Sequence, residues 1–237
     1  MARENGQTPI LSQQLLLSVA EELKLPLLQI ARQAEQGRLS GETDLALIQS
    51  AADTALRLLD SYALGVRLAQ APEGLEMESV SVSSVLYDTG QQLDALAKSY
   101  GVGLELNVAG RFGPVMTHRQ GLQAALASLG AALIEALPAQ DGTQLCLHLA
   151  THRSRYGIVA GLYADTKQLS RKALQRGREL QNRSRQPLTG LTHTSGAGVF
   201  VADTILRAMS LNLKPSRHRN LYGLGTVLQP TNQLHLV

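Results

Sequence analysis

Two adjacent carboxylates, Glu21 and Glu22, stand shortly before a proline, Pro26, in a largely apolar stretch. Proline removes a backbone donor and clashes with the preceding turn, so Pro26 should kink a helix that carries it. Glu21 and Leu25 are four residues apart and share one helix face. A carboxylate there could act as a fixed charge, or form an acyl phosphate if an intact metal site served it.

A second candidate for chemistry is the histidine pair His148 and His152, whose spacing of four would suit a metal on a helix. Leu145, Leu147 and Leu149 alternate with less apolar residues, however, which indicates a strand. A strand does not bring these two histidines together, so we expect no metal site. No Ser-His-Asp or Cys-His arrangement can be argued from spacing.

A basic stretch follows further along the chain, with Glu179 as its one acidic residue. Its cations are Lys167, Arg171, Lys172, Arg176, Arg178, Arg183 and Arg185. Two interpretations of the stretch are a solvated loop and a loop that supplies a cation to a phosphate group. Nucleic-acid binding is a further alternative, because such a stripe neutralises phosphates. The absence of interleaved aromatics in it argues against that alternative, and we do not expect a nucleic-acid partner.

Two long helices must position the Glu21 region. The first is predicted from Thr8, an N-cap before Pro9, to about Glu35, and the second spans roughly 43–69. Residues 37–42 form the connection expected between antiparallel helices. Apolar residues repeat every seven positions along both helices. The first helix has two such rows, one of Leu16, Leu23 and Ile30 and one of Ala20, Leu27 and Ala34. The second helix also has two, one of Leu45, Ala52, Leu59 and Val66 and one of Ile48, Ala55 and Tyr62. Two such hairpins would close a core as a dimeric four-helix bundle.

Composition divides the chain into two units. Of its 237 residues, 1–90 carry 6 basic and 12 acidic residues, and the remainder carries 16 basic and 7 acidic. Ala71-Pro72-Glu73-Gly74 interrupts the helical pattern, so we predict a helical hairpin over 1–71 and a second domain over 76–237. The single cysteine, Cys146, suits a reducing cytoplasm. We expect no membrane span and no signal peptide.

The second unit mixes helices and strands. Strands are predicted at 79–83, 102–108, 144–150, 156–164 and 223–228, and helices at 85–99, 119–136 and 198–209. This order predicts an α+β layer with helices on one face of a mixed sheet.

The stretch Glu21-Glu22-Leu23-Lys24-Leu25-Pro26-Leu27 resembles the phosphoacceptor box of sensor histidine kinases, which reads His-(Glu/Asp)-Leu-(Arg/Lys)-(Thr/Asn)-Pro-Leu. On this resemblance Glu21 stands at the phosphorylated histidine. Leu25 stands where a Thr or Asn orients water for dephosphorylation. The scaffold of the box is present, and both chemical residues are replaced.

The second unit resembles the ATP-binding domain of the same kinases, in the same order after the hairpin. On this alignment Ser128 and Ala132 occupy the positions of two asparagines that hold magnesium and phosphates. Asp165 keeps the aspartate of an Asp-x-Gly-x-Gly box without its glycines. The remaining matches are to two glycine boxes of the family, Gly196-Ala197-Gly198 before an apolar helix and Gly225-Thr226 before the last strand.

The resemblance implies a dimeric, catalytically degenerate histidine-kinase-like adaptor that docks a response-regulator receiver domain or a partner kinase. It implies no cofactor, because Ala132 offers no oxygen to magnesium. The rival is a working phosphotransferase or ATPase that binds ATP and magnesium in an atypical site.

Overall fold

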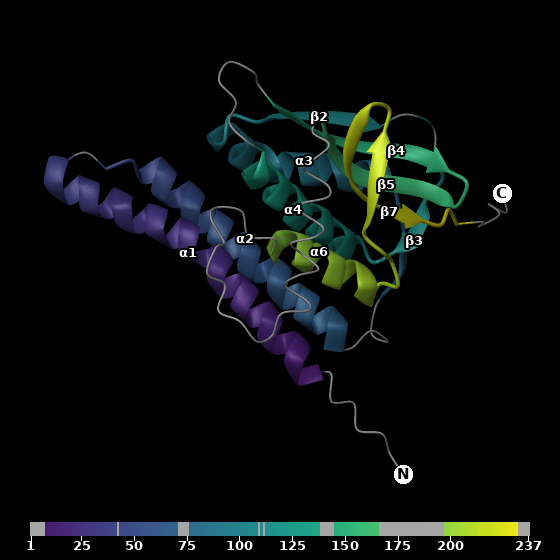
Figure 1. The fold of residues 1–237 in the computed structure, drawn as a ribbon, viewed down its shortest axis with the longest axis horizontal. Helices are drawn as coiled ribbons and strands as arrows, with labels where there is room; N and C mark the ends of the chain where they lie inside the picture. Colours follow the sequence, from purple (N-terminus) through teal and green to yellow (C-terminus); the bar gives the residue numbers. More distant parts are fainter. Residues whose placement is uncertain are drawn as a thin grey trace, which may run out of the picture.

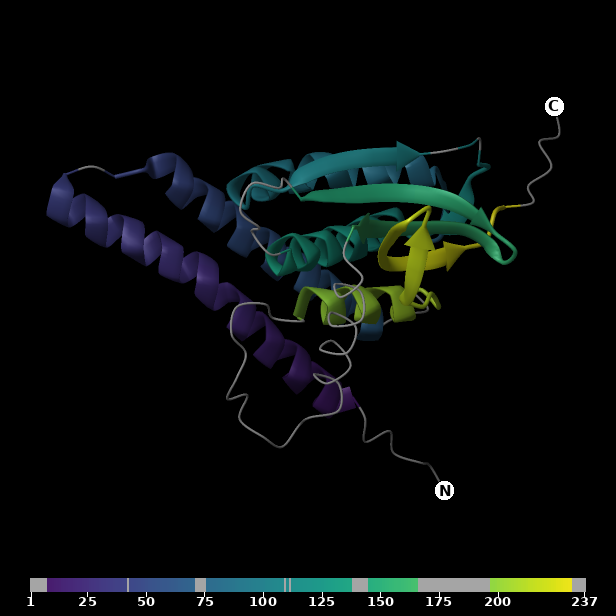
Figure 2. The ribbon, with the colours of Figure 1, turned by 45° about the horizontal axis from the view of Figure 1, so that its top comes forward.

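The computed structural model describes residues 8–41, 43–70, 76–108, 110, 112–137, 145–165 and 197–231. The described helices are α1 (Thr8–Ser40), α2 (Leu45–Gln70), α3 (Val82–Ser99), α4 (Arg119–Ala136) and α6 (Ala197–Ala208). The strands are β1 (Glu78–Val80), β2 (Gly103–Val108), β3 (Val115–Thr117), β4 (Cys146–Ser154), β5 (Gly157–Ala164), β6 (Lys214–His218) and β7 (Leu221–Leu228). They form three layers: a sheet, then α3, α4 and α6, then the α1–α2 hairpin (Figures 1 and 2).

The larger sheet has the strand order β2-β4-β5-β7-β6. β2 and β4 are parallel and every other neighbouring pair is antiparallel, so the sheet is mixed. The helices α3, α4 and α6 cover one of its faces (Figure 2). These features confirm the predicted α+β class. β1 and β3 pair separately as a two-stranded antiparallel sheet.

Two predicted helix boundaries were wrong, at the start of α3 and at the end of α1. The predicted strand over 79–83 ends at Val80, because the Ser81 side chain accepts a hydrogen bond from the Ser84 amide and caps α3. α1 continues to Ser40, so residues 37–40 are helical and not part of the connection. The predicted helix over 119–136 is confirmed, with His118 Nδ1 accepting from the Gly121 amide as its N-cap.

Two strands were missing from the prediction. β3 has only three residues, too few to show an alternating pattern. β6 contains Pro215, and it lies at the sheet edge, where a strand tolerates proline. The expected domain boundary at 71–74 lies outside the described residues.

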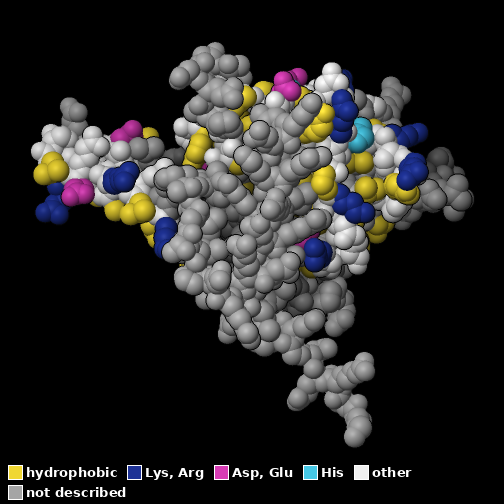
Figure 3. Space-filling model, viewed as in Figure 1, with side chains coloured by type: hydrophobic (Ala, Val, Ile, Leu, Met, Phe, Trp, Pro, Cys, Tyr) yellow, Lys and Arg dark blue, Asp and Glu magenta, His cyan; other side chains and the backbone are white. Residues whose placement is uncertain are grey.

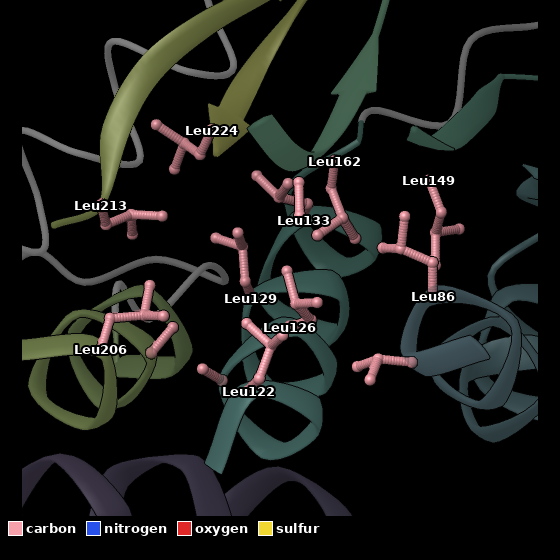
Figure 4. Close-up of a cluster of buried hydrophobic side chains, with 14 of the residues drawn as sticks. Leu86, Leu122, Leu126, Leu129, Leu133, Leu149, Leu162, Leu206, Leu213 and Leu224 are labelled. Carbon is pink, nitrogen blue, oxygen red and sulfur yellow. The ribbon is translucent and has the colours of Figure 1, made fainter. Parts of the chain in front are cut away.

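The core lies between the sheet and the second layer, and α4 is its central helix. Leucines from α3, α4, α6 and the sheet meet there, as Figure 4 shows: Leu86, Leu122, Leu126, Leu129, Leu133, Leu149, Leu162, Leu206, Leu213 and Leu224. A side-chain carbon at Gly130 would overlap Leu93 of α3. The small residues of α4 therefore let the neighbouring helices approach closely. The leucines of α4 in addition contact the sheet.

The C-terminal half of α2 joins this core. Leu68 is buried in the same cluster, and Gly65 faces Ile205 of α6. The Arg57 guanidinium donates to the Gln92 carbonyl at 3.3 Å, which ties α2 to α3. α1 packs mainly on α2 and is the outermost helix (Figure 1). None of the described helices combines the length and the apolar character that a bilayer crossing requires.

Glu135 lies at the end of α4 in a half-buried position. Burial raises the pKa of its carboxyl to about 7. Its charge contributes to raising the pKa of Tyr100, after the burial of that phenol. The folded chain therefore holds a proton on Glu135 over a range where the unfolded chain has lost it.

We expect the free energy of unfolding to fall as pH rises from about 4.5, the ordinary Glu135 value, to about 7, its folded value. Glu135→Gln should flatten this dependence and stabilise the fold at pH 8 by roughly 1–2 kcal/mol. Urea unfolding at several pH values measures both. The exposed Glu76→Gln is the control, and an unchanged pH profile in Glu135→Gln would contradict the assignment.

Candidate functional site

The region of the predicted phosphoacceptor box lies on one continuous helix, α1. Pro26 is buried, while Leu27 and Leu28 are each 55% exposed. The side chains of Glu21, Glu22 and Leu25 lie outside the described part of the structure, so their role stays a prediction. What the structure adds is that the helix is apolar and open to solvent directly after Pro26.

The residues of the seven-residue rows are partly buried and partly exposed to solvent. Leu23 and Ile30 are half-buried, whereas Ala20, Leu27 and Ala34 are exposed. On α2 the exposed side includes Leu45, Leu56 and Leu59, while Ala55 is buried and Tyr62 and Val66 pack against the core. The hairpin thus keeps an uncovered apolar strip although α2 is fixed to the rest of the chain.

Ser128 lies on α4 and is 4% exposed. It lines a cavity of about 40 Å³ between α2, α3 and α4, together with Arg57, Ser61 and Gln92. Its hydroxyl has no hydrogen-bond partner among the described residues. This cavity has room for water and none for a nucleotide.

The other predicted nucleotide-binding positions are spread over several elements. Ala132 is buried on α4, and Gly198 is buried in the first turn of α6. Thr226 is buried on β7 opposite Ala160 of β5, whereas Asp165 follows the end of β5 and is exposed. Asp165 is five residues beyond Ala160, so its backbone lies about 16 Å along the sheet from Thr226. The structure therefore does not bring this pair together.

Gly196 and the whole basic stretch from Lys167 to Arg185 fall outside the described residues. The described ends of that interval are β5, which ends at Ala164, and α6, which begins at Ala197.

The sheet face that points away from the helices carries a ring cluster that sequence reasoning missed. The ring centroids of His152 and His218 are 5.4 Å apart, and Tyr163 lies 6.1 and 5.5 Å from them. Tyr163 donates to Ser216 Oγ at 3.1 Å. A side chain at Gly161 would collide with the Tyr163 hydroxyl, so a glycine there lets the phenol lie flat on the sheet.

Burial and cationic surroundings keep this cluster neutral. Burial lowers the pKa of His152. Burial is also the largest cause that lowers the pKa of His218, followed by His152, Arg219 and His148. Burial raises the pKa of Tyr163 to about 12. The sequence carries no acidic residue over 145–164 or after Asp203, and Lys, Arg and His side chains gather around the β6–β7 hairpin (Figure 3).

One further group on the sheet combines residue types that bind metals. Glu105, Cys146 and His148 offer donor atoms that all lie within 4.8 Å of one another. Burial, and then the Glu105 charge, raise the pKa of the Cys146 thiol. The sequence alone could have indicated Cys146 and His148, because they are two residues apart on one predicted strand. It could not have indicated Glu105, which is near them only because β2 pairs with β4.

No protein-family model matches this sequence, and no curated protein is similar to it. The fold, by contrast, is similar to solved structures. The Acinetobacter baumannii histidine kinase AdeS is similar over 89% of this chain and 98% of its own, with a TM-score of 0.50 and 15% identity. Full-length ShkA in complex with AMPPNP matches over 93% of this chain and 46% of its own, with a TM-score of 0.52 and 13% identity.

At this level of identity the comparison concerns architecture. The chain has the α+β fold found in histidine kinases, and the order of its elements agrees with the predicted resemblance. Activity and binding do not follow from a shared fold.

The unpartnered Ser128 hydroxyl gives a test of the cavity. Ser128→Ala should change the free energy of unfolding by less than about 0.5 kcal/mol, since no described hydrogen bond is lost. Thr89→Val is the comparison, because the Thr89 hydroxyl donates to the Val85 carbonyl at 2.7 Å and should cost about 1 kcal/mol when removed. Equal losses in urea unfolding would show that a group in the cavity satisfies Ser128.

Proposed function

We propose that this chain is a catalytically degenerate, histidine-kinase-like signalling adaptor. It dimerises through its hairpin and docks a receiver domain or a partner kinase beside residue 21. The observation that carries the proposal is the apolar, exposed surface of α1 directly after Pro26, where Leu27 and Leu28 are each 55% exposed. Such a surface on the outermost helix is accessible to a second protein.

The proposal excludes phosphoryl transfer on chemical grounds. Transfer to a side chain needs a nucleophile, an aligned γ-phosphate and a metal that spreads its charge. Glu21 replaces the imidazole of the family box, and Ala132 has no oxygen for magnesium. Ser128, the other position aligned with a metal-binding asparagine, lines the narrow cavity against α2 and α3. A working site would need all of these parts at once.

The hairpin surface suits two kinds of contact. Yellow hydrophobic side chains line the protruding end of the hairpin in Figure 3. The exposed leucines in the middle parts of α1 and α2 are Leu27, Leu28, Leu56 and Leu59. Burying them in a dimer would stabilise it by about 25 cal/mol for each Å² of apolar surface removed from water. The carboxylate of Glu21 would then present a fixed charge to an incoming receiver domain.

The decisive variant is Glu21→His. Because the metal positions are replaced independently, this variant should fold but should not become labelled by γ-³²P-ATP with magnesium. The experiment compares wild type, Glu21→His and the double variant Glu21→His/Ala132→Asn by autoradiography after gel electrophoresis. Labelling of Glu21→His alone would show a working nucleotide site and replace the adaptor by the kinase alternative.

Receiver docking is measured separately, by biolayer interferometry against purified receiver domains from the same organism. We expect a receiver to bind wild type without ATP, and Glu21→Gln to slow its association, because interface charge governs association rate more than affinity. The exposed Glu35→Gln, on the same helix, is the control. Equal association rates for all three proteins would remove Glu21 from the docking surface.

Dimerisation has its own test. Leu27→Asp should convert the dimer to monomer at tens of micromolar chain, because it places a charge in an apolar seam. The control is Leu39→Asp on the same helix, since Leu39 is 84% exposed and lies outside the seven-residue rows. Sedimentation velocity gives the masses. A monomeric wild type, or dissociation by both variants, would contradict the bundle.

A further inference from the structure

The sheet face that points away from the helices is built by residues that alternate with the core. On β4, Leu147 and Leu149 point into the core, so Cys146 and His148 share the opposite face. β2 runs parallel to β4 with Glu105 directly opposite His148. Residue 103, directly opposite Cys146 on β2, is a glycine, so no side chain stands at that register position.

The polar atoms of this group already converge. Glu105 Oε2 lies 3.1 Å from His148 Nδ1, and Asn107 Nδ2 lies 3.0 Å from the same nitrogen. One donor atom each from Glu105, Cys146 and His148 lies within 4.8 Å of the other two. Donors bound to one tetrahedral ion at about 2.0–2.3 Å stand roughly 3.3–3.7 Å apart. A small movement of the Cys146 and Glu105 side chains would therefore bring all three to one ion.

We propose that Glu105, Cys146 and His148 form a binding site for a divalent transition-metal ion, with Zn²⁺ as the expected occupant. A thiolate, an imidazole and a carboxylate are the ligand types that zinc takes in proteins. A mixed sulfur, nitrogen and oxygen set disfavours Mg²⁺ and Ca²⁺, which prefer oxygen throughout. Three protein ligands leave a fourth position for water or an external ligand.

The strands make the site rigid enough to bind an ion. Two ligands come from one strand and the third from its hydrogen-bonded neighbour, so strand pairing fixes their backbones. The His148 side chain is 16% exposed and Glu105 is 56% exposed, which leaves a path from solvent. Asn107 lies directly beside the proposed ligands, with its amide nitrogen 3.0 Å from His148 Nδ1.

The proposed ion site is independent of the proposed adaptor function. It lies on the sheet face opposite the helical layer, whereas the hairpin packs on the other side of that layer (Figure 2). It also differs from the histidine pair weighed in the sequence, because His152 belongs to the Tyr163 ring cluster and His148 to this group.

Cobalt substitution tests the site with an unambiguous readout. Cys146 is the only cysteine in the chain, so a thiolate-to-Co²⁺ charge-transfer band can come from no other residue. Untagged, reduced protein is titrated with Co²⁺ and then with Zn²⁺, which should displace the cobalt. We expect one ion per chain, an intense near-ultraviolet band and visible bands of tetrahedral cobalt.

The variants separate the ligands from their surroundings. Cys146→Ser should abolish the band, and His148→Ala and Glu105→Gln should each weaken Zn²⁺ binding by about 100-fold or more. Asn107→Ala should weaken it by about 10-fold. His152→Ala is the matched control, a histidine of the same strand and face, and should bind within about twofold of wild type. Circular dichroism confirms that each variant is folded.

Two results would overturn the proposal. One is the absence of a thiolate band in folded wild type at millimolar Co²⁺. The other is a band that persists unchanged in both His148→Ala and Glu105→Gln, which would mean that the cysteine binds metal without its neighbours.

Discussion

The close packing of α4 is the constraint on which the rest of the structure depends. Its leucines contact the sheet, while Gly130 admits Leu93 of α3 and Gly121 faces Met209 beyond α6 and Leu68 of α2. Larger residues at these glycines would push three helices outward and open the core, at a cost of order 1–3 kcal/mol each. This close packing has a chemical consequence. Because α4 is built mainly of Ala, Gly and Leu, few of its side chains could bind a cation or phosphate.

The same packing explains why the hairpin is not a free appendage. Arg57, Gly65 and Leu68 contact α3, α6 and the core in turn, so three turns of α2 are fixed to the second layer. In the described part of the chain, α1 packs mainly on α2 and to a smaller extent on α6. A partner that binds α1 near Leu27 and Leu28 therefore meets exposed apolar residues whose position is set by α2.

Sequence patterns predicted the parts of the fold that depend on one chain segment at a time. The seven-residue rows predicted α1 and α2, alternating apolar residues predicted β2 and β4, and β5 and β7 were also predicted as strands. Boundaries failed where a single side chain decides the outcome, as Ser81 does by capping α3. The spatial relations between segments far apart in the sequence were the hardest to predict. Strand register separates Asp165 from Thr226 and joins Glu105 to His148, and neither fact is visible without the pairing of β5 with β7 or of β2 with β4.

The two faces of the sheet differ in the residues they carry, and this difference limits where a binding site can form. The face covered by the helices is apolar and close-packed, and the hydroxyl of Thr226 on it has no hydrogen-bond partner among the described residues. The face that points away from the helices carries His148, His152 and His218, the buried Tyr163 and the Cys146 thiol, with Glu105 on β2 beside Cys146 and His148. Burial, and then the charge of Glu105, raise the pKa of the Cys146 thiol, and a cation bound between the thiol and the carboxylate would lower it. Glu105, Cys146 and His148 therefore stand on the side of the sheet that helix packing does not constrain.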